Sequence, residues 1–183
     1  MEEYRINYEK LEKYFEKNNI QLDTKKVVKN NNQKIAVICY AKNEFGEYLL
    51  LERFKEPFPG KLVAPGGKTY YDESIEDSIF REFKEETGIK LNNTKLKVIT
   101  SEDGPEHYNW ILFIFTSEIK KQNLIDCDEG ILRWVYKDDI KTNNITSIDA
   151  ELLDHIFGNK KKYVDISYIT PKEFTINEII ELN

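Results

Sequence analysis

Residues 67–89 read GKTYYDESIEDSIFREFKEETGI, and this stretch decides how the chain is interpreted. No Gly or Pro occurs from Glu73 to Thr87, and Gly88 stands where a left-handed helix C-cap is expected. Asp72 is the predicted N-cap. The stretch therefore predicts one helix of about four turns that follows a glycine-rich loop.

The acidic residues of this helix do not all lie on its polar side. On a wheel of about 100° per residue, Glu82 and Glu86 lie within about 20° of the apolar Ile75. An acidic run is often a solvated face, but these like charges repel each other and Glu85, and Lys84 lies on the opposite side. Because partly buried carboxylates need a cation, we expect one among them, and hard oxygen ligands suit Mg²⁺ or Mn²⁺.

The sequence before this helix predicts a β-hairpin followed by a shaped loop. Residues 34–41 (KIAVICYA) and 47–54 (EYLLLERF) have the apolar runs of strands, and residues 43–46 predict the turn between them. We expect no regular element in the loop that follows, because Pro and Gly are too dense there. These residues are Pro57, Pro59, Gly60, Pro65, Gly66 and Gly67.

The sequence after the helix predicts further strands and one short amphipathic helix. The expected strands are residues 95–100 (KLKVIT), 109–119 (NWILFIFTSEI) and 131–140 (ILRWVYKDDI), and the expected helix is residues 148–157 (IDAELLDHIF). Because strands and helices intermingle, the predicted class is α/β or mixed α+β.

We divide the chain into three parts. Residues 1–33 are an N-terminal helical appendage, because an apolar stripe there has helical spacing. The stripe consists of Ile6, Leu11, Tyr14 and Phe15. Residues 34–158 are the principal domain, and residues 159–183 are a C-terminal tail expected to pack on it. The tail could pair with the sheet or with the appendage, and the sequence leaves both open.

The composition indicates a globular protein with a charged surface. Apolar residues make up 40% of the chain and charged residues 33%, and the net charge is -6. This acidic balance argues against stable nucleic-acid binding, which needs clustered Lys and Arg. We find no signal peptide and no long apolar segment, so we expect no membrane association and a cytoplasmic location. Cys39 and Cys127 lack partner spacing, and we expect reduced, buried thiols.

The stretch first quoted resembles the Nudix box, G-x5-E-x7-R-E-U-x-E-E-x-G-U, where U is a bulky apolar residue. The matching residues are Gly67, Glu73, Arg81, Glu82, Phe83, Glu85, Glu86, Gly88 and Ile89. Phe83 departs slightly from the pattern, since this position is commonly aliphatic. The resemblance implies a Nudix-type α/β/α sandwich with a mixed β-sheet.

The resemblance also implies roles for these residues. Glu82, Glu85 and Glu86 would bind the divalent cations, Mg²⁺ or Mn²⁺, with a main-chain carbonyl of the Gly66–Gly67 loop as a further ligand. The pair Glu73 and Arg81 would hold the loop and the helix together.

MutT-type members of the family add a carboxylate from a loop before a late strand, and residues 129–134 (EGILRW) resemble that place. Glu129 is therefore the candidate for an additional metal ligand and base. The alternative is that Glu129 belongs to a solvated loop beside Asp126 and Asp128.

Aromatic residues are candidates for stacking a nucleobase. We single out Tyr108 and Trp134 as substrate-binding residues, together with the backbone of Gly66 and Gly67. Three further aromatic candidates are Phe58, Tyr70 and Tyr71.

The predicted function is metal-dependent hydrolysis of a nucleoside diphosphate linked to another moiety. The leading subclass is a MutT-like nucleoside triphosphate pyrophosphohydrolase, with oxidised guanine nucleotides among its candidate substrates. The enzymatic alternative is hydrolysis of ADP-ribose or of a dinucleoside polyphosphate. A non-catalytic, nucleotide-sensing regulatory domain would be expected to have a degraded box, and a decapping-like RNA enzyme would be expected to have a basic surface.

Overall fold

The computed structural model describes residues 6–170 and 172–183. The helices are α1 (Tyr8–Lys17), α2 (Thr24–Val27), α3 (Ile75–Thr87), α4 (Lys137–Ile140) and α5 (Ser147–Ile156). The strands are β1 (Lys34–Lys42), β2 (Glu47–Arg53), β3 (Leu62–Val63), β4 (Gly66–Lys68), β5 (Lys95–Asp103), β6 (Trp110–Glu118), β7 (Gly130–Tyr136), β8 (Lys161–Thr170) and β9 (Glu173–Leu182).

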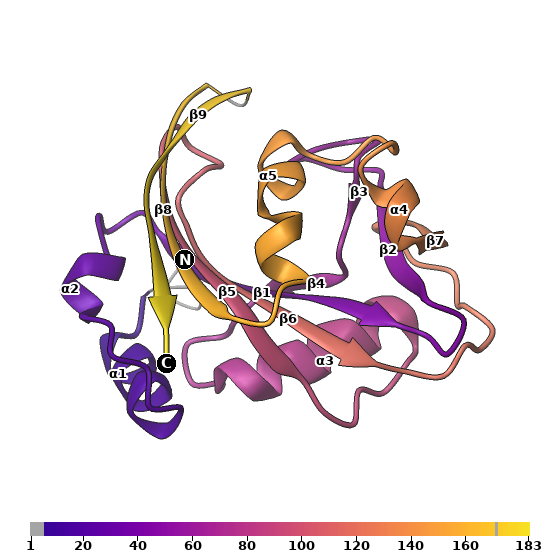
Figure 1. Cartoon of the computed structure of the whole chain (residues 1–183), viewed down its shortest axis with the longest axis horizontal. Coiled ribbons are helices and arrows are strands. Elements are labelled where there is room, and N and C mark those ends of the chain that lie inside the picture. Colours follow the sequence, from indigo (N-terminus) through magenta and orange to yellow (C-terminus); the bar gives the residue numbers. More distant parts are fainter. Residues whose placement is uncertain (1–5, 171) are drawn as a thin grey trace.

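The strands form one mixed sheet, which curves through the centre of the molecule (Figure 1). Its main order is β3-β2-β1-β6-β5-β8-β9, while β4 pairs with β1 and β7 pairs with β2. The pairs β1–β6 and β5–β8 are parallel, and the other pairs are antiparallel. The predicted hairpin is present, since β1 and β2 are joined through a turn in which Gly46 has a φ of 84°.

Helices cover both faces of this sheet. Helices α1 and α3 lie on one face and α5 lies on the other (Figure 1). Each face has its own buried apolar cluster, with Phe83 and Phe113 on the α3 face and Tyr40 and Leu152 on the α5 face. The fold is thus the expected α/β/α sandwich with a mixed sheet.

Helix α3 begins two residues after the position that we predicted from an Asp72 cap, and that cap assignment is wrong. Ser74 is the N-cap, because its hydroxyl oxygen accepts from the Asp77 main-chain N–H at 3.0 Å and donates to the Asp77 carboxylate at 2.7 Å. The C-cap is Gly88, as predicted, with a φ of 72° and its N–H bonded to the Lys84 carbonyl.

The loop before α3 contains two short strands, β3 and β4, which we did not predict. Gly66 makes the second of them feasible, because its φ is 151° and a Cβ there would lie 2.0 Å from the Val37 carbonyl oxygen. Only glycine allows the chain to approach β1 this closely. We predicted no regular element in this loop because glycine is dense there, yet a glycine is the residue that allows the loop to pair with β1.

The strand predicted over residues 131–140 is too long. It ends at Tyr136, and the following four residues form α4, whose Ile140 is fully buried. Asp138 and Asp139 lie in the first turn of α4, where negative charge is favourable near the helix N-terminus. The prediction ran past the last strand residue because Ile140 continued the apolar pattern.

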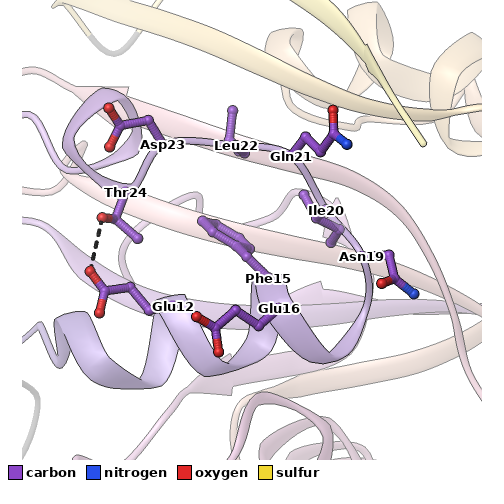
Figure 2. Close-up of a pocket in the computed structure, with 9 residues that line it drawn as sticks. All are labelled: Glu12, Phe15, Glu16, Asn19, Ile20, Gln21, Leu22, Asp23 and Thr24. Atoms are coloured by element: carbon purple, nitrogen blue, oxygen red, sulfur yellow. Dashed lines mark hydrogen bonds between the residues drawn. The ribbon is translucent and has the colours of Figure 1, made fainter.

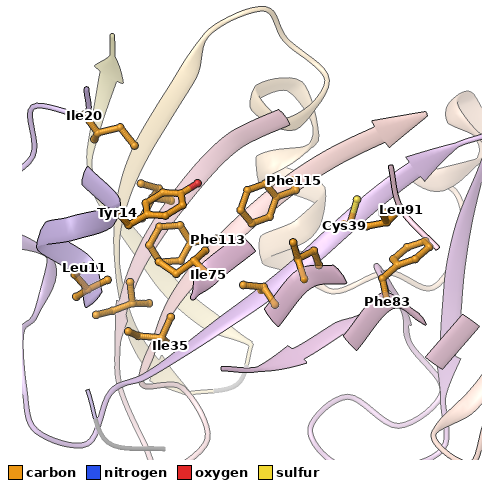
Figure 3. Close-up of a cluster of buried hydrophobic side chains, with 14 of the residues drawn as sticks. Leu11, Tyr14, Ile20, Ile35, Cys39, Ile75, Phe83, Leu91, Phe113 and Phe115 are labelled. Atoms are coloured by element: carbon orange, nitrogen blue, oxygen red, sulfur yellow. The ribbon is translucent and has the colours of Figure 1, made fainter. Parts of the chain in front are cut away.

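The N-terminal helix packs into the main core. Leu11, Tyr14 and Phe15 are buried in the cluster on the α3 face, and the Tyr14 ring lies 5.1 Å from the Phe113 ring (Figure 3). The apolar stripe predicted from the sequence is therefore the buried face of α1. Each such side chain contributes roughly 1.5–3 kcal/mol to folding when removed from water.

The C-terminal segment adds β8 and β9 to the sheet, and β8 pairs in parallel with β5. It also contacts the N-terminal appendage, because the Lys26 ammonium group lies 2.6 Å from the Glu178 carboxylate. Both alternatives left open by the sequence are therefore present.

The two cysteines are free, but they differ in burial. Cys39 is fully buried in the core, as expected, whereas Cys127 is only half-buried, so the expectation of a second buried thiol was wrong. Cys127 lies in the largely exposed connection before β7, where few apolar side chains cover it. Over the described residues, no helix has both the length and the apolar character that crossing a membrane requires.

Candidate active site

Glu73 and Arg81 join the loop to helix α3. The Arg81 guanidinium donates to both Glu73 carboxylate oxygens at 2.7 Å, and Ser78 donates to the same carboxylate at 2.6 Å. Burial raises the pKa of Glu73, but these hydrogen bonds outweigh it and the pKa lies below its usual value. The same guanidinium donates to the Lys68 carbonyl at the end of β4. Such a bidentate pair holds geometry more than it performs chemistry.

Glu82 lies directly against the glycine-rich loop. A Cβ on Gly67 would lie 2.4 Å from its carboxylate, so any side chain at this position would displace the Glu82 carboxylate. Burial raises the pKa of Glu82, and a 2.7 Å hydrogen bond from Arg81 opposes that shift.

Glu86 is the most deeply buried carboxylate of the helix, with an exposed fraction of 7%. It accepts one hydrogen bond, 2.8 Å long, from the main-chain N–H of Gly66. Burial is the largest cause that raises the pKa of Glu86 to about 8, and the neighbouring charges of Glu129 and Glu82 add to it. The prediction that Glu82 and Glu86 leave α3 on its apolar side is confirmed.

Glu85 lies apart from this pair. Its side chain is 60% exposed and lies 3.2 Å from the Arg81 guanidinium. Over residues 6–170 and 172–183, no three acidic, histidine or cysteine side chains are already arranged to hold a metal ion. Arg81 accounts for this, because it draws both Glu82 and Glu85 toward itself. Arg81 is thus a counter-charge for Glu82 and Glu85 that the sequence argument missed, since it considered only Lys84.

The pairing of β2 with β7 brings Glu129 toward Glu86 from a distant part of the chain. Arg53 pairs with Gly130 in this ladder, and the Phe54 N–H donates to the Glu129 carbonyl at 2.8 Å. The Arg53 guanidinium lies 3.6 Å from the Glu129 carboxylate. Sequence reasoning missed Arg53, since nothing near it in the chain indicates which strand it will face.

The appendage holds the loop between β4 and α3. The Lys10 ammonium group of α1 donates to the Tyr70 carbonyl, and Lys17 forms a 2.8 Å ion pair with Glu76 in the first turn of α3. The Arg81 guanidinium lies 4.3 Å from the centre of the Tyr70 ring. Contacts from α1 therefore hold the loop and the first turn of α3, which carry or adjoin the residues of the carboxylate site.

The aromatic candidates do not lie together. Tyr108 is buried on the α5 face, 5.8 Å from the Phe58 ring and 4.7 Å from the Tyr168 ring. Trp134 packs against the cluster on the α3 face instead. Tyr108 and Phe58 form one candidate platform for a base, and Trp134 belongs to a different surface.

One cavity lies away from these carboxylates. Its volume is about 550 Å³, and it is formed by α1 and the segment that leads into α2 (Figure 2). Its lining includes Glu12, Phe15, Ile20 and Asp23. The candidate site is identified by its chemistry and not by the size of a cavity.

A divalent cation fits the carboxylate site. Glu86 is buried with a single neutral hydrogen-bond donor, and two further carboxylates raise its pKa by their charge. Uncompensated negative charge of this kind is stabilised by a cation, and its hard oxygen atoms suit Mg²⁺ and Mn²⁺. Glu82 and the adjacent Gly66–Gly67 backbone supply further oxygen atoms beside Glu86.

Comparison with known proteins identifies the family. The model of the NUDIX domain matches residues 32–156. An uncharacterized Nudix hydrolase, YvcI of Bacillus subtilis, is 37% identical over 111 residues, which cover 58% of this chain and 68% of that protein. An ADP-ribose pyrophosphatase of Methanocaldococcus jannaschii is 35% identical over 72 residues, which cover 39% of this chain and 43% of that protein.

A solved structure extends this similarity to the fold. The mutator MutT protein of Bacillus halodurans superposes with a TM-score of 0.67 and 28% identity, over 80% of this chain and 96% of that one.

Proposed function

This chain belongs to the NUDIX domain family and is a hydrolase of nucleoside diphosphate-linked substrates, and we propose that it acts as a MutT-like nucleoside triphosphate pyrophosphohydrolase. The similarity to a MutT protein over 96% of that chain supports this subclass. The pair formed by the partly buried Glu82 and the buried Glu86, beside Gly66 and Gly67, is the observation that carries the proposal.

Members of this family use divalent cations, and we propose Mg²⁺ or Mn²⁺ here. Glu82 and Glu86 would hold the cation, together with a carbonyl of the Gly66–Gly67 loop, and Glu85 would join them by leaving Arg81. When bound, the cation activates water and neutralises charge on the diphosphate oxygens. Glu73 would keep Arg81 in place, so that the loop and α3 stay in register during turnover.

We further propose that Glu129 removes the proton from the attacking water or orients the residue that does so. Its side chain is half-exposed, on the connection before β7, and its charge acts on Glu86. A base on a connection of this kind can complete its contacts when substrate binds. Arg53, which lies beside Glu129, provides a positive charge for a substrate phosphate.

Tyr108 and Phe58 are the proposed stacking partners of the base. Their rings are adjacent, and Phe58 belongs to the loop that follows Arg53, the last residue of β2. Trp134 remains a proposed substrate contact on the opposite face. Of the two aromatic candidates, Tyr108 is the stronger for base stacking, because it lies beside Phe58. The ligand is therefore proposed to be a small nucleotide-like molecule.

Hydrolysis of ADP-ribose is the second candidate function, because one relative carries the name ADP-ribose pyrophosphatase. The test is a panel of substrates with Mg²⁺: dGTP, an oxidised dGTP, ADP-ribose and a dinucleoside polyphosphate. Release of diphosphate from the triphosphates at the highest kcat/KM supports the MutT-like proposal. Preferred release of AMP from ADP-ribose would replace it with the second candidate.

Two variants serve as controls for the substrate panel. Glu86→Gln should abolish the preferred activity, which excludes a contaminating phosphatase. Glu151→Gln, on the exposed side of α5, removes the same charge away from the site and should leave that activity unchanged.

A further inference from the structure

A second, basic cavity lies on the α5 face of the sheet. Its volume is about 230 Å³, and it opens where the ends of β1 and β6 and the beginning of β5 meet the C-terminal end of α5. Three lysines line it: Lys42, Lys95 and Lys97. In a chain with a net charge of -6, three cations around one small cavity require an explanation.

The three ammonium groups have no carboxylate partners among the described residues. The described residues form fourteen ion-pair contacts, and Lys42, Lys95 and Lys97 take part in none of these and in no side-chain hydrogen bond of the described structure. Glu118 is the one carboxylate in the lining, and it lies beyond ion-pair distance of all three. Positive charge therefore accumulates around the cavity without being neutralised.

The end of α5 does not account for three lysines. A helix C-terminus carries roughly half a negative charge, which one nearby cation satisfies. Adding the full charge of Glu118 gives roughly -1.5, against +3 from the lysines, so the cavity keeps a net positive charge. Stabilising the helix terminus is thus a partial explanation at most.

The remaining lining is rigid and suited to an anion. Phe157, at the end of α5, packs against Tyr40 and Tyr48 with ring separations of 5.7 and 4.7 Å, which fixes the floor of the cavity. Thr116 and Asn159 add a hydroxyl and an amide that can donate hydrogen bonds. The cavity is smaller than the roughly 300–1,000 Å³ of sites that enclose whole cofactors, so it suits a phosphate group and not a complete nucleotide.

We propose that this lysine cavity binds inorganic diphosphate at a site separate from the carboxylates. Tyr40 and Tyr48 belong to the cluster on the α5 face, whereas Glu82 and Glu86 project from α3 on the other face. The lysine cavity is positively charged and would bind an anion directly, whereas the carboxylate site is negatively charged and would bind a cation. The choice of diphosphate over other phosphate anions rests on the proposed function, since diphosphate is the product of a pyrophosphohydrolase.

Isothermal titration calorimetry in EDTA tests this proposal with the full chain. Without a cation, the carboxylate site disfavours an anion, and the lysine variants then assign any saturable uptake of diphosphate to the lysine cavity. The parent protein should bind one equivalent, and Lys95→Gln/Lys97→Gln should bind roughly tenfold or more weakly. Lys25→Gln/Lys34→Gln is the matched control, because it removes two exposed lysines elsewhere and should bind as the parent does.

Amide chemical shifts provide the second measurement. Diphosphate should perturb the signals of Thr116, Gly158 and Asn159 before those of Gly66 and Gly67. The absence of saturable binding by the parent, an equal loss in both double variants, or shifts confined to the carboxylate loop would each overturn the proposal. Glu86→Gln should bind diphosphate in EDTA like the parent, so failure of this site and failure of the proposed hydrolase activity remain distinguishable.

Discussion

Two pairs of buried or partly buried carboxylates lie on opposite faces of the sheet, and only one of these two pairs is suited to a metal. Glu82 and Glu86 belong to α3, while Glu102 and Asp149 lie at the end of β5 and in α5. Burial is the largest cause of raised pKa values in both pairs. The pKa is about 8 for Glu86, about 7 for Glu102 and about 6 for Asp149.

The pairs differ in what surrounds each carboxylate. Glu102 accepts a 2.6 Å hydrogen bond from the Thr100 hydroxyl, and Asp149 accepts one of the same length from Thr146. Glu86 accepts only a main-chain N–H, next to two like charges. The charge of Asp149 also raises the pKa of Glu102, so the difference between the pairs lies in their donors: a hydroxyl donor satisfies a buried carboxylate, whereas Glu86 lacks one and is left with a demand for a cation. The degree of burial alone does not separate the two.

The largest expected effect is on catalysis. Glu86→Gln, like Glu82→Gln, should lower kcat by roughly a hundredfold or more, because each removes a charge that a cation needs in the transition state. Glu102→Gln should leave the Mg²⁺ concentration for half-maximal activity unchanged. Steady-state kinetics over a Mg²⁺ series measures both. A Glu102→Gln variant that needed much more Mg²⁺ would contradict the distinction between the pairs.

Removing the metal should also lower the catalytic activity. EDTA should abolish activity reversibly, and Mg²⁺ or Mn²⁺ should restore it, whereas Ca²⁺ should bind without supporting turnover because its geometry is less strict. Initial rates after dialysis and re-addition provide the measurement. Full activity after exhaustive treatment with EDTA would remove the metal from the proposal.

A smaller loss is expected at Glu129. Glu129→Gln should lower kcat by roughly ten- to a hundredfold, because a positioned base contributes within that order and water can replace part of its role. Asp128→Asn, from the same connection, is the matched control and should have normal kinetics. Equal activity of the two variants would assign Glu129 to a solvated loop.

The stability of the metal-free protein should fall as pH rises. A carboxyl whose pKa is raised in the folded state stabilises the protein fully below its unfolded pKa, near roughly 4.3, and loses that contribution up to its folded pKa. For Glu86 the loss runs to about pH 8. Its size is on the order of a few kcal/mol.

Urea titrations between pH 5 and 8 in EDTA, roughly spanning that interval, measure this loss. The Glu86→Gln variant should have a flatter dependence and a higher stability at pH 8 than the parent. A parent protein whose unfolding midpoint rises over the same interval would overturn the sign of the argument.

The smallest expected effect concerns the brace between α1 and the loop. Lys10→Met removes the donor to the Tyr70 carbonyl and should lower kcat roughly two- to fivefold, since the loop positions Glu82 only indirectly. Lys13→Met, on the exposed side of the same helix, is the control. A change in kcat for the control alone would refute the brace.

Local sequence determines much of the site, and long-range pairing determines the rest. The spacing of Glu82 and Glu86 on one helix, and the cap at Gly88, follow from residues close in the chain. The Ser74 cap was missed because Asp72, Ser74 and Asp77 all have cap-forming side chains, and only packing selects among them.

Arrangements across the sheet could not be predicted. The register of β2 and β7 brings Arg53 to Glu129. The loop after β2 and the connection between β5 and β6 place Phe58 beside Tyr108, while Trp134 of β7 lies on the other face. The reach of Arg81 to both Glu82 and Glu85 depends on a rotamer that the sequence does not specify. Such features depend on tertiary contacts between segments that are distant in the chain.

The packing of α1 implies that the homology unit and the folding unit of this protein are different. A chain trimmed to the matched residues 32–156 would lose the side chains of Leu11, Tyr14 and Phe15, which fill the core beside Phe113. It would also strip β8 from β5 and leave a hydrophobic strand edge open to self-association. Recombinant production of the matched residues alone should therefore give aggregates, although every residue of the Nudix box would be present.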